Sequence, residues 1–156
     1  MHCALPYNAR HIEIMYIQSE DYTKVTEAIL EMDIRPQDLI VLLVAESDVL
    51  NLQALIASLN DARVAFVGGV FPGVIHNSTL HKKGVVVKKL QSVSAPIIIK
   101  GLNASNYEWP DFTLALPRLN KPVTAWIMID GLMPNIASFL SGLYDRLGDR
   151  VNFIGG

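Results

Sequence analysis

Hydrophobic and polar positions alternate along the chain in two ways, one typical of strands and the other of helices. Short apolar runs predict four strands in the first two thirds of the sequence, at residues 12–17, 39–45, 64–70 and 85–90. The run Leu39–Ala45 contains no polar residue, which favours a strand buried on both faces, as in a parallel sheet. The chain therefore begins with a strand-rich part.

Segments in which apolar residues have helical spacing lie between these runs. Apolar residues at positions 22, 25, 29 and 32 predict a helix over residues 21–32, which Pro36 prevents from continuing. A second stripe at positions 52, 55, 56 and 59 predicts another helix, which Ser47 and Asp48 are suited to cap. Residues 39–70 thus form a strand, a helix and a strand, and such a crossover is right-handed by default.

The second half of the sequence has a less regular hydrophobic pattern. Residues 76–83 are polar and predict a loop, residues 96–100 predict a strand, and residues 101–122 match no element. A strand is predicted at 124–129, and apolar spacing from Ile136 to Leu147 predicts an amphipathic helix with Pro134 in its first turn. A last strand is predicted at Val151–Ile154, and its exposed edge is a candidate for pairing with another copy.

Together these elements predict a single α/β domain over residues 1–156. We expect a three-layer-like open mixed sheet that is mostly parallel, with an antiparallel portion near residues 64–100 and with helices packed on it. Half of the 156 residues are hydrophobic (51%), so the chain can bury a sizeable core.

Charge and composition exclude several classes of function. The net charge is −2 and the basic residues are scattered, whereas a nucleic-acid-binding protein needs a clustered basic face. The apolar runs are much shorter than the roughly 18 residues of a membrane span. Cys3 is the only cysteine, so no intrachain disulfide is possible. These features predict a cytoplasmic protein with no nucleic-acid partner and no membrane span.

The stretch "VAFVGGVFPGVI" contains two adjacent glycines in an apparent strand. It lacks the Lys-Ser/Thr pair of a Walker A loop, and its glycine spacing is not that of a dinucleotide-binding fingerprint. One interpretation is a bulged strand that ends in a Pro-Gly turn. The alternative is the wall of a pocket, where absent side chains leave room for a ligand.

Asp130-Gly131 follows an apolar strand and precedes a helix. Ligands of open α/β sheets bind outside the carboxyl ends of strands, so Asp130 is placed to bind a ligand or to act in an enzyme of unknown substrate. A simpler interpretation is that the carboxylate satisfies backbone amides of the turn. No carboxylate pair and no nucleophile elbow supports catalysis, and the chain is therefore expected not to be an enzyme.

The histidines do not have the spacing of a helical metal pair. His76 and His81 lie five residues apart in the predicted loop, where exposure to solvent is the simple expectation. Haem needs only one axial histidine, so either residue is a candidate ligand for it.

Two segments resemble the N-terminal part of the FIST domain, a sensory module of bacterial signal transduction. The first contains "DLIVLLVAESDVLNLQALIASL", "VAFVGGVFPGVI" and "KGVVVKKL", and the second is "AWIMIDGLMPNIASFLSGLYDRLGDRVNFIGG". Their order matches that of the family, and together they span about half of the chain. Family members often carry an acidic residue where this chain has Val74, and they continue into a C-terminal half beyond the position of Gly156.

The resemblance implies a non-enzymatic sensory domain that binds a small molecule, possibly an amino acid. It implies relay to a partner kinase, cyclase or chemoreceptor, and some members resemble haem-dependent nitric oxide sensors. The glycine-rich strand and the Asp-Gly turn would then line the ligand site, at Gly68, Gly69, Phe71, Gly73, Asp130 and Gly131. A homo-oligomer is also compatible with the sequence.

Overall fold

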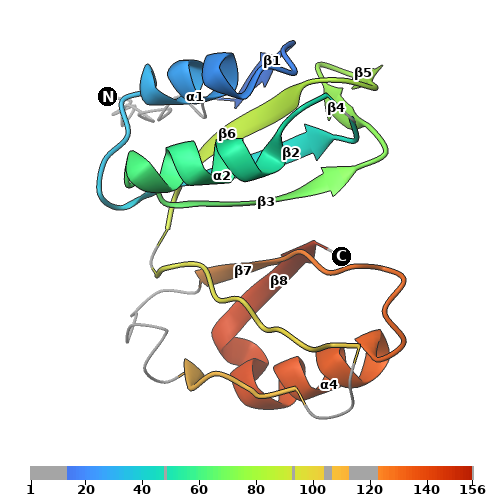
Figure 1. Ribbon diagram of the computed structural model, residues 1–156. Helices are drawn as coiled ribbons and strands as arrows, with labels where there is room; N and C mark the ends of the chain where they lie inside the picture. The colour runs from blue at the N-terminus through green and yellow to red at the C-terminus, as the bar shows by residue number, and fades with distance from the viewer. Residues whose placement is uncertain (1–13, 48, 93, 104–106, 113–122, 156) are drawn as a thin grey trace, which may run out of the picture. The chain divides into compact units, whose positions relative to one another are not determined.

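The computed structural model describes residues 14–47, 49–92, 94–103, 107–112 and 123–155 (Figure 1). The chain divides into two compact units, residues 1–92 and 93–156. Each unit is described by itself. The prediction that residues 1–156 act as one domain stays a prediction.

The first unit is built on a four-stranded sheet. Its elements are β1 (Ile14–Ile17), α1 (Tyr22–Leu30), β2 (Asp38–Ala45), α2 (Leu52–Asp61), β3 (Phe66–Phe71), β4 (Val74–His76), β5 (Thr79–His81) and β6 (Val85–Gln91). The strand order in the sheet is β1-β6-β2-β3, and β4 and β5 form a separate pair. The last strand of this unit, β6, therefore lies between the first two, β1 and β2.

The α/β class and the mixed open sheet are confirmed, and β6 provides the antiparallel portion that the sequence predicts near residues 64–100. In this sheet, however, antiparallel pairs outnumber parallel ones. Strand β2 pairs in parallel with β3, whereas β6 pairs antiparallel with both β2 and β1. The reason is the connection. A helix joins β2 to β3 and returns the chain for parallel pairing, whereas a hairpin precedes β6 and leaves it running the other way.

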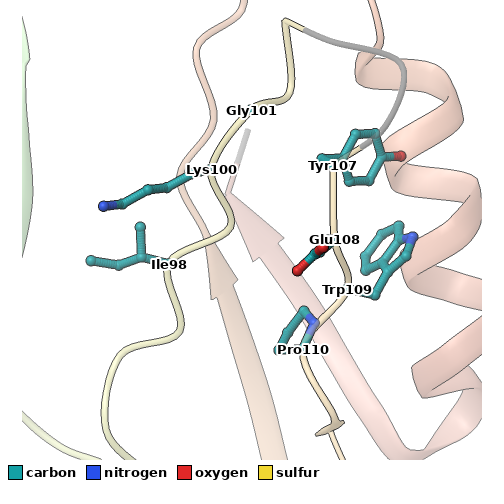
Figure 2. Close-up of a pocket in the computed structure, with 7 residues that line it drawn as sticks. All are labelled: Ile98, Lys100, Gly101, Tyr107, Glu108, Trp109 and Pro110. Atoms are coloured by element: carbon teal, nitrogen blue, oxygen red, sulfur yellow. The ribbon is translucent and has the colours of Figure 1, made fainter.

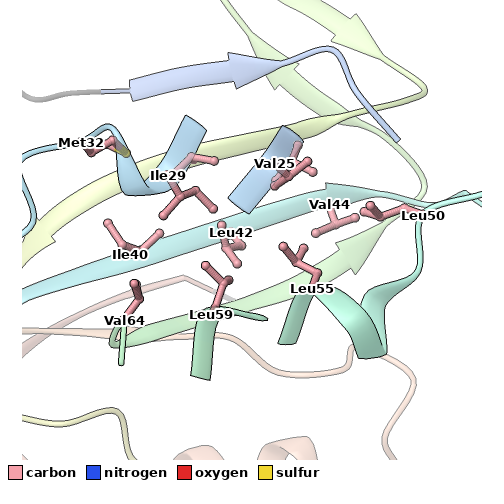
Figure 3. Packing of buried hydrophobic residues seen from close by; sticks show 12 residues of the cluster. Val25, Ile29, Met32, Ile40, Leu42, Val44, Leu50, Leu55, Leu59 and Val64 are labelled. Atoms are coloured by element: carbon pink, nitrogen blue, oxygen red, sulfur yellow. The ribbon is translucent and has the colours of Figure 1, made fainter. Parts of the chain in front are cut away.

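Both helices of this unit cover the same face of the sheet. Val25 and Ile29 of α1 and Leu55 and Leu59 of α2 pack on alternate residues of β2 (Figure 3). The other face carries a smaller cluster in which Val74 of β4 packs on Ala45 and Val86. Among the described residues of this unit, the two helices therefore form one layer, on one face of the sheet.

The helix caps differ in part from the prediction. The Asp21 side chain accepts a hydrogen bond from the Thr23 amide (3.0 Å) and caps α1. Asn51, and not Ser47, caps α2 by accepting from the Ala54 amide (3.0 Å). Position 48, the other predicted cap, lies outside the described residues. Helix α2 begins at Leu52, too far along the chain for the Ser47 side chain to cap it.

The polar segment 76–83 is not the predicted loop but contains a β-hairpin. Strands β4 and β5 pair antiparallel across Asn77 and Ser78, whose φ values are 48° and 63°. Two consecutive positive φ values define the tight turn that suits the twist of a hairpin. The hairpin escapes a hydrophobic-pattern analysis because its residues are mostly polar.

The second unit contains one strand–helix–strand segment. Strand β7 (Val123–Ile127) is followed by α4 (Ile136–Leu147), a short 3₁₀ helix (Gly148–Arg150) and β8 (Val151–Gly155). Strands β7 and β8 pair in parallel, with Val123 opposite Val151. Phe139, Leu143 and Leu147 of α4 form the core with Val151 and Phe112. The predicted helix is confirmed, although it begins two residues after Pro134.

The described residues between 94 and 112 belong to the second unit and form no strand. The predicted strand at 96–100 is wrong, because these residues form no strand. Pro96 has no backbone N–H and cannot donate a hydrogen bond to a neighbouring strand. Most of segment 101–122 lies outside the described residues, but Leu102, Tyr107 and Trp109 pack on the core of α4. In the described ranges, no helix is both long enough and apolar enough to cross a bilayer.

Candidate functional site

The two adjacent glycines lie in a regular strand, so the bulge interpretation is wrong. Pairing of β3 with β2 continues without a break from Phe66 to Phe71, with Gly68 opposite Leu42 and Gly69 opposite Leu43. A β-carbon at Gly68 would collide with the carbonyl oxygen of Leu42. The group that approaches the backbone at Gly68 is therefore the neighbouring strand.

The turn after β3 is also held by protein contacts. The Phe71 carbonyl accepts a hydrogen bond from the Glu46 amide (2.7 Å), which ties the ends of β3 and β2 together. A β-carbon at Gly73 would lie 3.0 Å from the His81 carbonyl oxygen, so the turn packs closely on the hairpin. Packing thus accounts for Gly68 and Gly73, and a ligand-binding role for the segment stays a prediction.

The two candidate haem ligands lie on one aromatic ring. Tyr16 of β1 stacks on His81 with 3.9 Å between ring centroids and on His76 with 5.9 Å. Both imidazoles are half-buried, and the neighbouring hairpin residues Ile75 and Leu80 are 69% and 57% exposed. A porphyrin needs an enclosed apolar slot, which this open hairpin does not provide. The geometry therefore does not fit a haem site.

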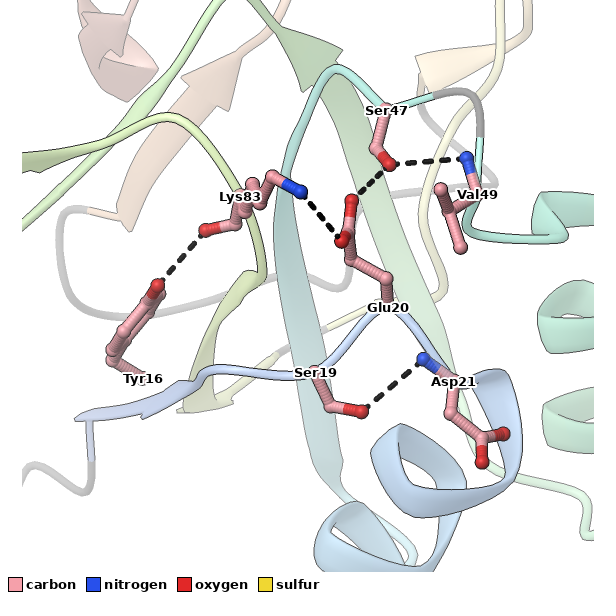
Figure 4. A network of polar contacts seen from close by, with 7 residues as sticks. All are labelled: Tyr16, Ser19, Glu20, Asp21, Ser47, Val49 and Lys83. Carbon is pink, nitrogen blue, oxygen red and sulfur yellow. Dashed lines mark hydrogen bonds and ion pairs between the residues drawn. The ribbon is translucent and has the colours of Figure 1, made fainter.

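A polar network joins three elements at the same end of the first unit (Figure 4). The Glu20 carboxylate accepts a hydrogen bond from the Ser47 hydroxyl and pairs with the Lys83 ammonium (3.2 Å). The Tyr16 hydroxyl donates to the Lys83 carbonyl (2.9 Å). The Ser47 hydrogen bond, followed by Lys83, holds the pKa of Glu20 below its ordinary value of 4.5. The network fixes the loop before α1 against the segment that follows β2 and the segment that precedes β6.

The Asp-Gly turn has the simpler of its two predicted roles. The Asp130 carboxylate accepts a hydrogen bond from the Leu132 amide (2.9 Å), and its carbonyl accepts from Met133 (3.1 Å). Asp130 and Gly131 are exposed, and Leu132 is 93% exposed. The carboxylate therefore shapes the turn between β7 and α4, and a ligand contact from Asp130 or Gly131 stays a prediction.

The predicted ligand residues fall into two groups. Gly68, Gly69, Phe71 and Gly73 belong to the first unit, and Asp130 and Gly131 belong to the second. Within the described residues, neither group lines the pocket between residues 98 and 110 or the pocket between residues 30 and 64. The same part of the chain contains no cluster of three His, Cys, Asp or Glu side chains that could hold a metal ion.

One pocket of about 550 Å³ lies in the second unit, between two extended segments (Figure 2). Ile98, Lys100 and Gly101 come from one segment and residues 107–110 from the other. The Glu108 carboxylate points into the space between the segments, whereas Tyr107 and Trp109 point towards α4. We call this the Lys100–Glu108 pocket. In the same view the Lys100 and Ile98 side chains point to the other side of their own segment, away from Glu108. The lining thus includes one basic and one acidic residue, whose side chains do not face one another.

Aromatic packing holds the second segment in place. The Trp109 ring stacks on Phe139 of α4, with 5.2 Å between centroids and 3° between planes. The Arg146 guanidinium lies 4.2 Å from the Trp109 ring centroid, which is the geometry of a cation–π contact. Tyr107 also meets the Phe139 ring edge-on. Because Tyr107 and Trp109 flank Glu108, their packing fixes the backbone that presents its carboxylate.

Sequence reasoning missed this pocket. Lys100 ends a predicted strand that does not form, and Glu108 lies in a segment that matches no element, so no pattern places the two residues together. The available signal was the alternation Tyr107-Glu108-Trp109-Pro110, in which large aromatic residues flank a charge. Such alternation in an extended segment sends the aromatics to one side and the charge to the other.

Comparison with known proteins gives one family. A model of the FIST N domain matches residues 37–156, which includes both strand–helix–strand segments and the Lys100–Glu108 pocket. No curated protein and no solved structure gives a significant match. The match covers well over half of the sequence and agrees with the family that the motifs predict. The chain therefore belongs to the FIST N domain family, whose members are sensory domains of signal transduction.

Proposed function

We propose that this FIST N domain is a ligand-binding sensor and that the Lys100–Glu108 pocket takes an α-amino acid. The observation that carries the proposal is that the lining of a single pocket includes one basic residue, Lys100, and one acidic residue, Glu108. Its volume of about 550 Å³ is in the range of small-molecule sites.

The two charges match the two charges of an α-amino acid. A ligand carboxylate would accept a hydrogen bond from Lys100, once this flexible side chain turns towards the pocket, and a ligand ammonium would donate to the Glu108 carboxylate; both bonds would be charge-assisted. Ile98, Tyr107 and Pro110 provide apolar surface for a side chain. A molecule that lacks either charge would leave one protein charge without its partner and would bind more weakly.

Occupation of the pocket would be passed on through its aromatic wall. Tyr107 and Trp109 pack on Phe139 of α4, so a ligand that orders residues 107–110 also stabilises the packing of this helix. We propose that a kinase, a cyclase or a chemoreceptor in the cytoplasm reads this change. On this proposal the domain itself is not an enzyme.

Titration of the purified chain with each common α-amino acid tests the proposal. Trp109 lines the pocket, so its fluorescence reports occupation directly, and a Trp126→Phe background removes the other tryptophan. Binding at 100 times the dissociation constant should add about 2.7 kcal/mol of stability, visible as a thermal shift. The amino acid found should then be compared with its N-acetyl and its amide derivatives, each of which lacks one charge.

We expect Glu108→Gln and Lys100→Gln each to raise the Kd about tenfold, because each removes one charge-assisted hydrogen bond. Glu27→Gln and Lys24→Gln change the same charges at exposed positions of α1 and should leave the Kd unchanged. The proposal is wrong if no amino acid binds, or if both derivatives bind as tightly as the parent compound.

A further inference from the structure

A second pocket of about 540 Å³ lies in the first unit, beyond the carboxyl ends of its two helices. Its floor is apolar and includes Met32 and Val64, which are 6% and 9% exposed and belong to the main core. Arg35 and Arg63 also line it. We call it the Arg35–Arg63 pocket. It is distinct from the Lys100–Glu108 pocket, which lies in the other unit.

Arg63 is held in a backbone conformation that does not suit an arginine. Its φ is +56°, in the left-handed region, directly after Ala62 at the end of α2. Helices commonly end with such a residue, and it is usually glycine because a β-carbon is strained there. Strain at a residue with a large charged side chain points to a role for that side chain.

The equivalent arginine of the second unit shows what a structural role looks like. Arg63 and Arg150 both open the motif R-V-x-F-[V/I]-G-G, which occurs twice in the sequence. Arg150 donates from Nε to the Leu147 carbonyl (3.3 Å) and from Nη2 to the Arg146 carbonyl, and so caps the end of α4. In the part of the chain that the structure describes, the Arg63 guanidinium has no such partner. Helix capping therefore does not explain Arg63.

The other arginine of the pocket is only loosely engaged. Arg35 pairs with Asp33 at 3.3 Å, and the two side chains are 65% and 80% exposed. Exposed ion pairs contribute little free energy because water screens them. A ligand carboxylate can therefore replace Asp33 as the partner of Arg35.

We propose that the Arg35–Arg63 pocket binds an organic carboxylate with a short apolar tail. The guanidinium fork matches a carboxylate in a bidentate geometry, and two arginines at one pocket provide two such forks. The tail would lie on Met32, Ile34 and Val64. The domain would then have a second ligand site, on the unit that does not contain the Lys100–Glu108 pocket.

The test is an NMR titration of the full ¹⁵N-labelled chain with sodium hexanoate, compared with 1-hexanol and hexylammonium. Hexanoate should shift the amide signals of Met32, Ile34 and Val64 in a saturable way, and the two other probes should shift them little. Equal shifts with hexanol would show that only the apolar floor binds and would overturn the proposal. So would the absence of saturable shifts with hexanoate.

Substitution of Arg63 separates binding from folding. Arg63→Gly relieves the strained φ, so this variant should be at least as stable as the parent, while its Kd for hexanoate should rise about tenfold. Lys24→Gln removes the same charge from an exposed position on α1 and should leave the Kd unchanged. Asp33→Asn should tighten hexanoate binding because it frees Arg35. Unchanged binding by Arg63→Gly would overturn the proposal.

Discussion

The segments β2–α2–β3 and β7–α4–β8 are two versions of one strand–helix–strand plan. In each, an α-helix joins two parallel strands, and the second strand carries R-V-x-F-[V/I]-G-G. In each, the first glycine of the pair lies against a carbonyl of the preceding strand, Gly68 against Leu42 and Gly155 against Ile127. The shared motif therefore reflects a shared requirement for close approach of two backbones.

The two versions differ in how many faces of their strands are covered. Strand β2 reads DLIVLLVA, and residues on both of its faces are buried. Strand β7 reads VTAWI and alternates, with Trp126 39% exposed, and its partner β8 leaves Ile154 53% exposed. The shared motif thus accompanies parallel strand pairing in both segments. The other residues of each strand differ between the segments, and they indicate whether both faces of the strands are covered.

The largest effect should come from the last leucine of each helix. Leu59 is fully buried in the cluster of the first unit, and Leu147 is 4% exposed in that of the second. We expect Leu59→Ala to cost about 4 kcal/mol and Leu147→Ala about 3 kcal/mol, since fewer atoms surround the smaller core. Urea denaturation followed by far-UV circular dichroism measures both values.

The same experiment examines the single-domain prediction. Both tryptophans, Trp109 and Trp126, belong to the second unit, so tryptophan fluorescence follows that unit alone. If the chain is one cooperative domain, Leu59→Ala lowers the fluorescence midpoint together with the dichroism midpoint. A fluorescence midpoint that does not move would contradict the single-domain prediction.

Gly68→Ala should cost about 3 kcal/mol, because its β-carbon forces β3 away from β2 along the centre of their pairing. Gly131→Ala is a matched control, since no atom lies within 4 Å of the added carbon. We expect the control to leave the free energy of unfolding within about 0.5 kcal/mol of the parent value. Equal stability of the two variants would show that β3 can move without cost.

Two threonine substitutions compare a covered face of β2 with the exposed face of β8. Val41→Thr places a hydroxyl at a position that is 1% exposed and should cost about 2 kcal/mol. Ile154→Thr makes a similar change where water already reaches the side chain, and it should stay within about 0.5 kcal/mol. A large loss for Ile154→Thr, measured by urea denaturation, would mean that something covers this face in solution.

The capping of α2 should have a smaller effect. Asn51→Ala removes the acceptor for the Ala54 amide and should cost about 1 kcal/mol. Asn60→Ala deletes the same side chain at an exposed position within α2, where it makes no cap. Hydrogen exchange of the first-turn amides should accelerate in the first variant and not in the second.

The smallest expected effect is on the pH dependence of the free energy of unfolding. The pKa of Glu20 is lowered by Ser47 and then by Lys83, so the carboxylate stabilises the folded state above its ordinary value of 4.5. That contribution is lost as the pH falls through the lowered pKa of the folded state. Glu20→Gln should therefore be less stable than the parent at neutral pH, and the difference should disappear in acid. A difference in urea midpoints that persists at the lowest pH would contradict this account.

The sequence predicts the elements that bury an apolar stripe and misses those that do not. Helices α1, α2 and α4 and strands β2 and β6 lie where the hydrophobic pattern places them, because burial alone determines their spacing. The hairpin β4–β5 depends instead on the positive φ values of Asn77 and Ser78, a dipeptide without a strong turn signature. The antiparallel pairing of β6 agrees with the antiparallel portion that the sequence predicts near residues 64–100, because no helix pattern precedes this strand.

The candidate sites were harder to predict for a related reason. Glycines and an Asp-Gly turn attract attention in a sequence, but the protein itself supplies the contacts of Gly68 and the Asp130 carboxylate. The charged residues Lys100 and Glu108 of the pocket lie in segments that form neither strand nor helix, and the packing of Trp109 on Phe139 holds the backbone beside Glu108 in place. A pocket of this kind can be recognised only in the folded structure, because its lining residues come from separate segments of the chain.

The insertion of β6 between β1 and β2 has a consequence for synthesis of the chain on the ribosome. Strands β2 and β3 can pair as soon as both have emerged, but β1 must wait for a partner that lies about 70 residues further along. At the usual rates of translation, roughly 5–20 residues per second, this delay lasts several seconds. Throughout that time the apolar strand Ile14–Ile17 of the nascent protein is unpaired, and the sheet closes only when Val85–Gln91 arrives.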